Sequence, residues 1–131
     1  MNWLRSAAAA VLAVHGLIHL IGFVVPWHLA SIAGVAARTT VLVGAVELGD
    51  AGSRVMGLMW LALAVGFVAA AWGLWHGRAW AVPAAGLCAA ASLVVCVLGL
   101  PDTPFGIGVD VAILGLLGYR TTRRLEAPAA P

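Results

Sequence analysis

Residues 6–25 read SAAAAVLAVHGLIHLIGFVV, and this stretch decides the fold class. It contains no aspartate, glutamate, lysine or arginine, and it stops at Pro26. A helix that crosses the hydrocarbon core of a bilayer needs about 20 apolar residues. The stretch therefore predicts a membrane-spanning helix. A signal peptide is the alternative, with Arg5 as its basic region and a cleavage site at residues 34–36, but the apolar stretch is longer than such peptides use and holds two histidines.

The composition of the whole chain also favours a bilayer as solvent. Of the 131 residues, 63% are hydrophobic and only 9% are charged, whereas soluble domains have about 45–50% and 25%. The net charge of +2 comes without a basic patch, so we expect no nucleic-acid partner. The composition excludes a soluble domain, a disulfide scaffold and a disordered tail, and it leaves the function open.

Three more apolar stretches complete the predicted fold, an all-α, four-helix transmembrane bundle. They cover residues 55–75, 79–99 and 104–119. The first two contain no formal charge, and Pro83 is tolerable because it falls in the first turn of its helix. The last is shorter and carries Asp110. We expect residues 1–120 to form a single domain and residues 121–131 a short cytoplasmic tail.

The arginines near the ends of these stretches predict the orientation. Cytoplasmic loops of membrane proteins carry the excess of basic residues. With the N-terminus inside, five arginines lie on the cytoplasmic side and two outside: Arg5, Arg78, Arg120, Arg123 and Arg124 against Arg38 and Arg54. We therefore expect a multi-pass protein of the bacterial inner membrane with both termini in the cytoplasm.

The long loop between the first two helices then lies outside the cell. Residues 39–43 and 45–48 are short β-prone runs on either side of Gly44, which predicts a small hairpin. Asp50 is expected to be the N-cap of the second helix. Asp102, followed by a threonine and Pro104, is expected to begin the fourth helix in the same way.

Small residues recur at helical spacing on two of the predicted helices. Close approach through small side chains drives helix association in lipid. Both faces of the last helix need shelter from lipid, because Asp110 lies opposite its stripe of small residues. One face is expected to meet the bundle and the other a second copy, so a homodimer is one hypothesis for the partner. The two stripes are Gly66, Ala70, Gly73 and Gly77, and Gly108, Ala112, Gly115 and Tyr119.

Three polar residues inside the predicted spans need an explanation. His15 and His19 are four apart, so they share one face of the first helix. Asp110 is the only acid within a span, and such residues face the bundle interior and pair. We therefore expect the two histidines to face Asp110. Further binding residues are expected near the outer mouth and on the second helix: Trp27, His28, Glu47, Arg54, Met59 and Trp60.

These residues leave several functions open. One is acid–base chemistry on a lipophilic molecule, isoprenoid or quinone-like, such as isomerisation, epoxide opening or cyclisation without a cofactor. In that case Asp110 or His19 would donate a proton and His15 would be its partner. A second is a metal site, with Asp110 or His28 as third ligand, or proton passage. A third is a non-catalytic subunit or scaffold of a redox or transport complex, in which the polar residues only tie helices together. The sequence does not decide whether the protein is an enzyme.

Two cysteines lie in the third predicted helix. Cys88 and Cys96 are eight residues apart, which is about 12 Å along a helix. Disulfide-bonded residues have Cα atoms closer than about 7 Å. We therefore expect two free thiols that act as small apolar core residues.

The pattern His15-Gly16-x-x-His19-x-x-Gly22 resembles the first helix of the DoxX-like small four-helix membrane proteins. The length and the four-span layout also resemble that group. The resemblance covers about ten residues, and this chain has a histidine where such proteins commonly show lysine. It implies the four-helix fold and an association with quinone or redox partners. It transfers no catalytic residue.

Overall fold

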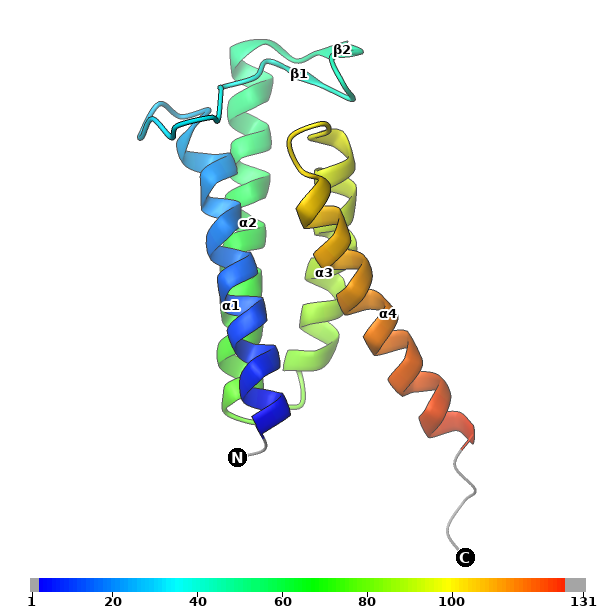
Figure 1. Cartoon of the computed structure of the whole chain (residues 1–131). Helices are drawn as coiled ribbons and strands as arrows, with labels where there is room; N and C mark the ends of the chain where they lie inside the picture. The colour runs from blue at the N-terminus through cyan, green and yellow to red at the C-terminus, as the bar shows by residue number, and fades with distance from the viewer. Residues whose placement is uncertain (1–2, 127–131) are drawn as a thin grey trace, which may run out of the picture.

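A computed structural model of the chain describes residues 3–126, which form four helices and one short hairpin (Figure 1). The fold is helical, as predicted, and three of the helices, α1 to α3, are long and apolar enough to cross a membrane. The helices are α1 (Trp3–Val24), α2 (Gly49–Trp75), α3 (Ala81–Leu98) and α4 (Pro104–Glu126), and the strands between α1 and α2 are β1 (Thr40–Val41) and β2 (Val46–Glu47).

The start of α2 differs from the expectation. The helix begins at Gly49, so Asp50 lies inside its first turn and is not the N-cap. Leu48 occupies the cap position and makes no capping hydrogen bond through its side chain. The prediction for Asp50 was therefore wrong, although a carboxylate in the first turn still complements the helix dipole. The six residues before Val55 are polar or small and extend the helix beyond its apolar part.

The turn between α2 and α3 is a Schellman motif. The amide of Arg78 donates to the carbonyl of Gly73, and the amide of Gly77 donates to the carbonyl of Leu74. Gly77 has a φ of +69°, which a glycine adopts without strain. Gly77, predicted to belong to a packing stripe, therefore ends the helix instead.

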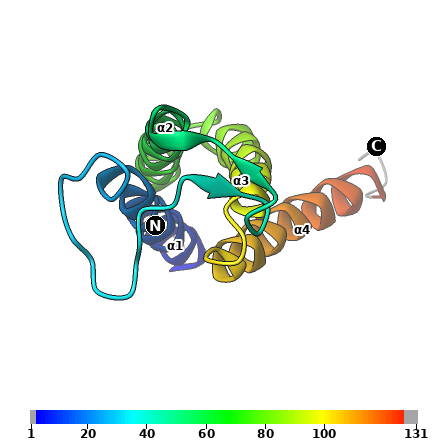
Figure 2. The same ribbon diagram turned by 90° about the horizontal axis from the view of Figure 1, so that it is seen from above.

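The helices pack in chain order around an open arc (Figure 2). α1 packs on α2, α2 on α3, and α3 on α4. Gly66 and Gly73, from the predicted stripe on α2, face α3. A Cβ atom on Gly66 would lie 2.7 Å from Cys88 Sγ, and one on Gly73 would lie 2.7 Å from the Trp80 ring. α4 begins beside α3 and tilts away from the other helices toward its C-terminal end (Figure 1).

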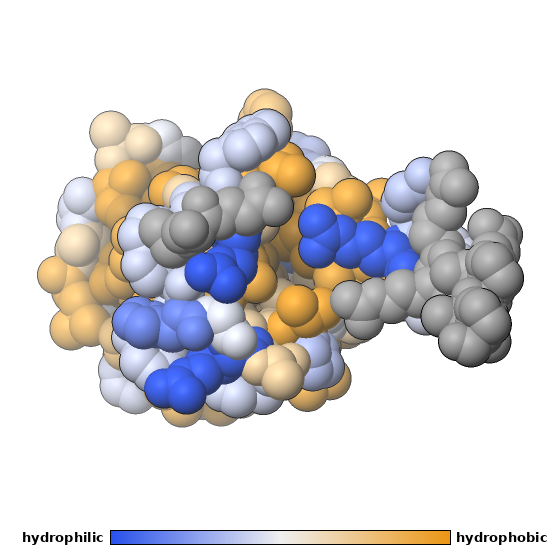
Figure 3. Space-filling view, turned by 90° about the horizontal axis from the view of Figure 1, so that it is seen from below, coloured by the Kyte–Doolittle hydropathy of each residue, from blue (hydrophilic) through white to orange (hydrophobic). Residues whose placement is uncertain are grey.

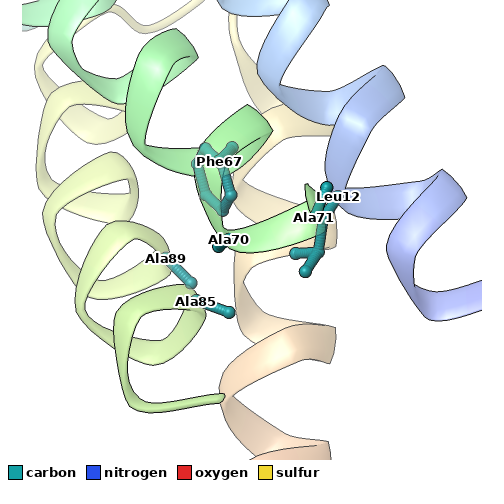
Figure 4. Close-up of a cluster of buried hydrophobic side chains, with 6 residues drawn as sticks. All are labelled: Leu12, Phe67, Ala70, Ala71, Ala85 and Ala89. Atoms are coloured by element: carbon teal, nitrogen blue, oxygen red, sulfur yellow. The ribbon is translucent and has the colours of Figure 1, made fainter. Parts of the chain in front are cut away.

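The apolar core lies between α1, α2 and α3, toward the end of the bundle opposite the hairpin (Figure 4). Four of its six members are alanines, so the helix backbones approach one another closely. Phe67 is the one large ring and is fully buried. The members are Leu12, Phe67, Ala70, Ala71, Ala85 and Ala89.

The predicted hairpin is present, and it docks on the end of α3. β1 and β2 pair antiparallel, with Thr40 opposite Glu47. The amides of Leu42 and Val43, at the tip, donate to the carbonyls of Leu98 and Leu100. These bonds satisfy carbonyls that a helix end leaves free. Leu42 and Val43 have φ values of +52° and +60°, so docking is accompanied by backbone strain at two non-glycine residues.

The start of α4 is where the sequence placed it, with Pro104 at the first helical position. Asp102, two residues earlier, was predicted to cap this helix, but its side chain has a different role. The Asp102 carboxylate forms a two-pronged ion pair with the Arg38 guanidinium, including a bond of 3.1 Å from Nη2 to Oδ1. Asp102 therefore ties the long loop to the α3–α4 turn. At its other end α4 continues past Tyr119 to Glu126, so this part of the expected tail is helical, and residues 127–131 lie outside the described residues.

Candidate functional site

His15 and Asp110 are joined across the fold, from α1 to α4. His15 Nε2 donates to Asp110 Oδ1 at 3.0 Å, and the two residues are 4% and 0% exposed. The second carboxylate oxygen, Oδ2, is buried without a hydrogen-bond partner among the described residues. Of the two histidines that were expected to face Asp110, His15 does so. His19 does not, because its ring nitrogens bond to the His15 carbonyl and to Ser92.

His19 faces α3 rather than Asp110. Its Nδ1 donates to the backbone carbonyl of His15 at 2.8 Å, because a carbonyl oxygen can only accept. Its Nε2 lies 2.8 Å from the hydroxyl of Ser92, which is fully buried. In the neutral ring Nε2 is then the unprotonated nitrogen, so Ser92 donates to it.

Aromatic rings hold both imidazoles in place. The Phe67 ring lies with its centroid 4.8 Å from that of His15 and 5.3 Å from that of His19. The Trp60 ring lies 5.1 Å from His19 on another side. These ring contacts shield the sides of the His15 and His19 imidazoles from water and restrict their rotamers. Gly22 makes room for Trp60, because a Cβ atom there would lie 2.5 Å from the indole.

A cavity of about 620 Å³ begins at this polar cluster and extends to the hairpin end of the fold. His15 and His19 line its inner end, and Arg38 and Asp102 line its outer end. Most of the remaining wall is apolar: Ile18, Ile21, Val25, Val41, Leu48, Met56, Trp60, Phe105 and Val109. Its size lies within the range of about 300–1,000 Å³ that is usual for small-molecule sites.

Of the other predicted binding residues, only one lines the cavity. Trp60 lines the cavity, whereas Met59 is exposed and Met56, one turn earlier, lines it instead. Four more predicted residues do not line it: Trp27, His28, Glu47 and Arg54. Trp27 donates through its indole to the Arg54 carbonyl at 3.1 Å, and the Glu47 carboxylate accepts from the Gly49 amide at 3.0 Å. His28 is exposed, at a positive φ of 54°. None of these four lines the cavity in this structure, and a binding role for them stays a prediction.

Sequence reasoning missed Ser92 and Cys96. Ser92 is the only hydroxyl residue in the third apolar stretch, a signal that could have pointed to a polar contact. Cys96 is 1% exposed to solvent but lines the cavity, and its Sγ lies 3.8 Å from Ser92 Oγ. Cys88, as expected, packs in the core. Cys96 is therefore a cavity residue as well as a packing residue.

The donor set gives no support to a metal site. Within residues 3–126 as described, no three His, Cys, Asp or Glu side chains are grouped so that they could hold one ion. Both nitrogens of His19 are already hydrogen-bonded, and one nitrogen of His15 is bonded to Asp110. The arrangement is suited to hydrogen bonding and proton transfer.

Comparisons with known proteins give no relative for this chain. No protein-family model matches it, and neither curated proteins nor solved structures give a match. The geometry of the cavity and its polar cluster is therefore the basis on which a function is proposed below.

Proposed function

We propose that this is an integral membrane protein whose cavity binds a lipophilic small molecule and exchanges a proton with it through His15. The observation that carries the proposal is the position of His15, between a buried carboxylate and a largely apolar cavity. A histidine–carboxylate pair can give and take a proton, and at the inner end of an apolar pocket it does so away from bulk water.

The chemistry follows from the two nitrogens of His15. Asp110 holds a proton on Nε2, which leaves Nδ1 without a hydrogen-bond partner among the described residues, on a side chain that lines the cavity. Nδ1 accepts a proton in the neutral ring and donates one in the imidazolium, which the Asp110 carboxylate stabilises. Because Asp110 does not line the cavity, His15 exchanges the proton and Asp110 positions it.

The ligand that fits this cavity is apolar along its length, with an oxygen at one end. An isoprenoid or quinone-like molecule has that form, and its carbonyl, hydroxyl or epoxide oxygen would bond to His15. Isomerisation, epoxide opening and cyclisation of such a molecule need only proton transfer. We propose these as the reaction classes.

The arginines support a membrane orientation with both termini in the cytoplasm of a bacterial cell. The start of α1, the α2–α3 turn and the C-terminal part of α4 lie toward the end of the fold opposite the hairpin, where hydrophilic side chains gather (Figure 1 and Figure 3). These segments contain Arg5, Arg78 and Arg120. The ion pairs among the described residues join His15 to Asp110 and Arg38 to Asp102, so none of them involves these three arginines. A basic end without acidic partners is typical of the cytoplasmic side. The resemblance to DoxX-like proteins agrees with this four-span layout and stays a prediction.

The test is retention of a small molecule through purification. Protein extracted in mild detergent is denatured in organic solvent, and the released molecules are counted per chain by mass spectrometry. We expect a stoichiometric lipophilic molecule in the wild type and less than about a tenth of it in His15→Ala, since a charge-assisted hydrogen bond contributes about 1.5–3 kcal/mol. His76→Ala is the matched control, because His76 is exposed and bonded only to its own helix. Equal retention in both variants would refute the proposal.

The outer face of α4 favours a second function, association with another membrane helix. Gly108 and Gly115 have open space around them, and Ala112 and Tyr119 on the same stripe are exposed. We propose a second copy of the chain as the partner. Native mass spectrometry in mild detergent should show a dimer that Gly115→Leu dissociates, and a wild-type monomer throughout would contradict it.

A further inference from the structure

Cys96 ends a chain of three hydrogen-bonding side chains that begins at His19. Cys96 Sγ lies 3.8 Å from Ser92 Oγ, and Ser92 Oγ lies 2.8 Å from His19 Nε2. All three side chains are buried, and both Cys96 and His19 line the cavity. The thiol thus faces the same cavity as the imidazole to which it is connected.

The direction of these hydrogen bonds is fixed by the backbone. His19 Nδ1 must carry a proton, because it donates to the carbonyl of His15. In neutral His19 the lone pair is on Nε2, so Ser92 donates to it and is left to accept from the Cys96 thiol. A proton that leaves the sulfur therefore has a continuous path through Ser92 to His19.

We propose that Cys96 is a nucleophile that adds to lipophilic molecules carrying a carbon–carbon double bond conjugated to a carbonyl. This inference rests on the proposed function, since it assigns a substrate class to the same cavity. As sulfur forms a bond to the β-carbon, its proton passes to Ser92 Oγ while the Ser92 proton passes to His19 Nε2. The π electrons of the double bond move to the carbonyl oxygen as an enolate, and the α-carbon takes a proton from the His15 imidazolium. The net change is addition of S–H across the double bond, with one proton moved from His15 to His19.

A second observation, independent of the cysteine, points to a ligand beside it. His15 is 4% exposed, its Nδ1 has no partner among the described residues, and the side chain lines the cavity. That nitrogen is the proton donor which the enolate requires. On α4, Gly106 leaves the space that the sulfur occupies, because a Cβ atom there would lie 2.7 Å from Cys96 Sγ.

Cys88 provides a control within the same helix. It is more exposed than Cys96, and no hydrogen bond to its thiol is present among the described residues. If access alone governs reactivity, Cys88 reacts first. If the Ser92–His19 chain acts as a general base, Cys96 reacts first, because general-base catalysis contributes about 10²–10⁴-fold.

The experiment measures the rates at which N-ethylmaleimide modifies both cysteines in the wild-type protein in mild detergent, by peptide mass spectrometry. We expect Cys96 to react at least about tenfold faster than Cys88. The titratable groups that interact with this chain are His15 and Asp110: both act on His19, and Asp110 also acts on the Cys96 thiol. The Cys96 rate should rise with pH only until His19 is neutral, whereas the Cys88 rate should keep rising as its thiolate forms. Ser92→Ala should reduce the Cys96 rate at least about tenfold and remove the plateau, with the Cys88 rate unchanged. Faster modification of Cys88 in the wild type would overturn the proposal even if Ser92→Ala failed to fold.

A second measurement separates this proposal from the proposed function. In the wild type, the released molecules are counted separately as free ligand and as adduct on the peptide that contains Cys96. Retention of a non-covalent molecule with no preference for Cys96 in the labelling would refute only the nucleophile. A reactive Cys96 in a protein that retains no molecule would refute only the ligand proposed above.

Discussion

At Gly16 the α1 helix lies close to the backbone of α2, and replacing this residue tests how the site is assembled. A Cβ atom on Gly16 would lie 2.8 Å from the Cβ of Phe67 and 3.1 Å from the carbonyl oxygen of Ala64. Neither atom is the end of a flexible side chain. Gly16→Ala must therefore push α1 away from α2. The displacement also loosens the contact between the Phe67 ring and the His15 imidazole.

The size of the effect follows from this geometry. Ordinary van der Waals contact begins at 3.4 Å, so the contact with Phe67 must open by at least about 0.6 Å. Overpacking of this kind costs about 1–3 kcal/mol, while alanine in place of glycine favours a helix by about 0.5–1 kcal/mol. Gly118→Ala gains the same helix propensity without the clash, because the space around Gly118 is open and Gly118 is not part of the stripe proposed to meet a second copy. The difference between the two variants isolates the packing cost of about 1–3 kcal/mol.

Thermal unfolding in one mild detergent, followed by circular dichroism, measures that difference. At about 3–5 °C per kcal/mol for a chain of this length, Gly16→Ala should unfold about 3–15 °C below Gly118→Ala. Gly118→Ala itself should unfold at or slightly above the wild-type temperature. Equal unfolding temperatures for the two variants, or a higher one for Gly16→Ala, would show that α1 and α2 are not in this close contact.

Three further predictions concern the polar contacts and the loop. A double-mutant cycle of His15→Ala and Asp110→Ala should give a coupling free energy of about 0.6–1.7 kcal/mol in thermal unfolding, and additive effects would contradict the contact between them. Asp102→Asn weakens a half-exposed ion pair with Arg38, so proteinase K should cut the loop at residues 28–39 up to about fivefold faster, as a loss of about 0.2–1 kcal/mol implies; an unchanged rate would mean that the pair does not restrain the loop. Val43→Asn should raise the free energy of unfolding by about 1 kcal/mol, because Val43 is exposed and holds a φ of +60°, and a loss of stability would refute the inferred strain.

Much of the fold is predictable from local patterns along the chain. Uninterrupted apolar stretches predict helices because no charged side chain needs water, and Pro104 begins α4 because its ring suits a first helical turn. The hairpin follows from the short β-prone runs on either side of Gly44. Cap residues are less predictable. Asp50 and Asp102 both have the residue type of an N-cap, but one lies inside its helix and the other pairs with Arg38.

Part of the site is also predictable, for a physical reason. A histidine or carboxylate inside an apolar stretch must find a polar partner, and Asp110 is the only acid in such a stretch, so its meeting with His15 needs little further information. The path of the long loop is different. Whether Trp27, His28 and Glu47 face the cavity depends on how the chain turns between α1 and the hairpin. Polar side chains in this loop can bond to water instead of to protein groups, so nothing forces them to point inward.

The sequence by itself determined the helical fold, the face shared by His15 and His19, and the need of Asp110 for a partner. Only the tertiary structure decided that Ser92 and Cys96 join this cluster and that Arg38 closes the far end of the cavity. The difference has a physical cause. Helical periodicity fixes which residues of one helix share a face, but the rotation and depth of one helix against another depend on the sum of many small contacts between residues distant in sequence, such as Gly16 with Phe67 and Gly106 with Cys96.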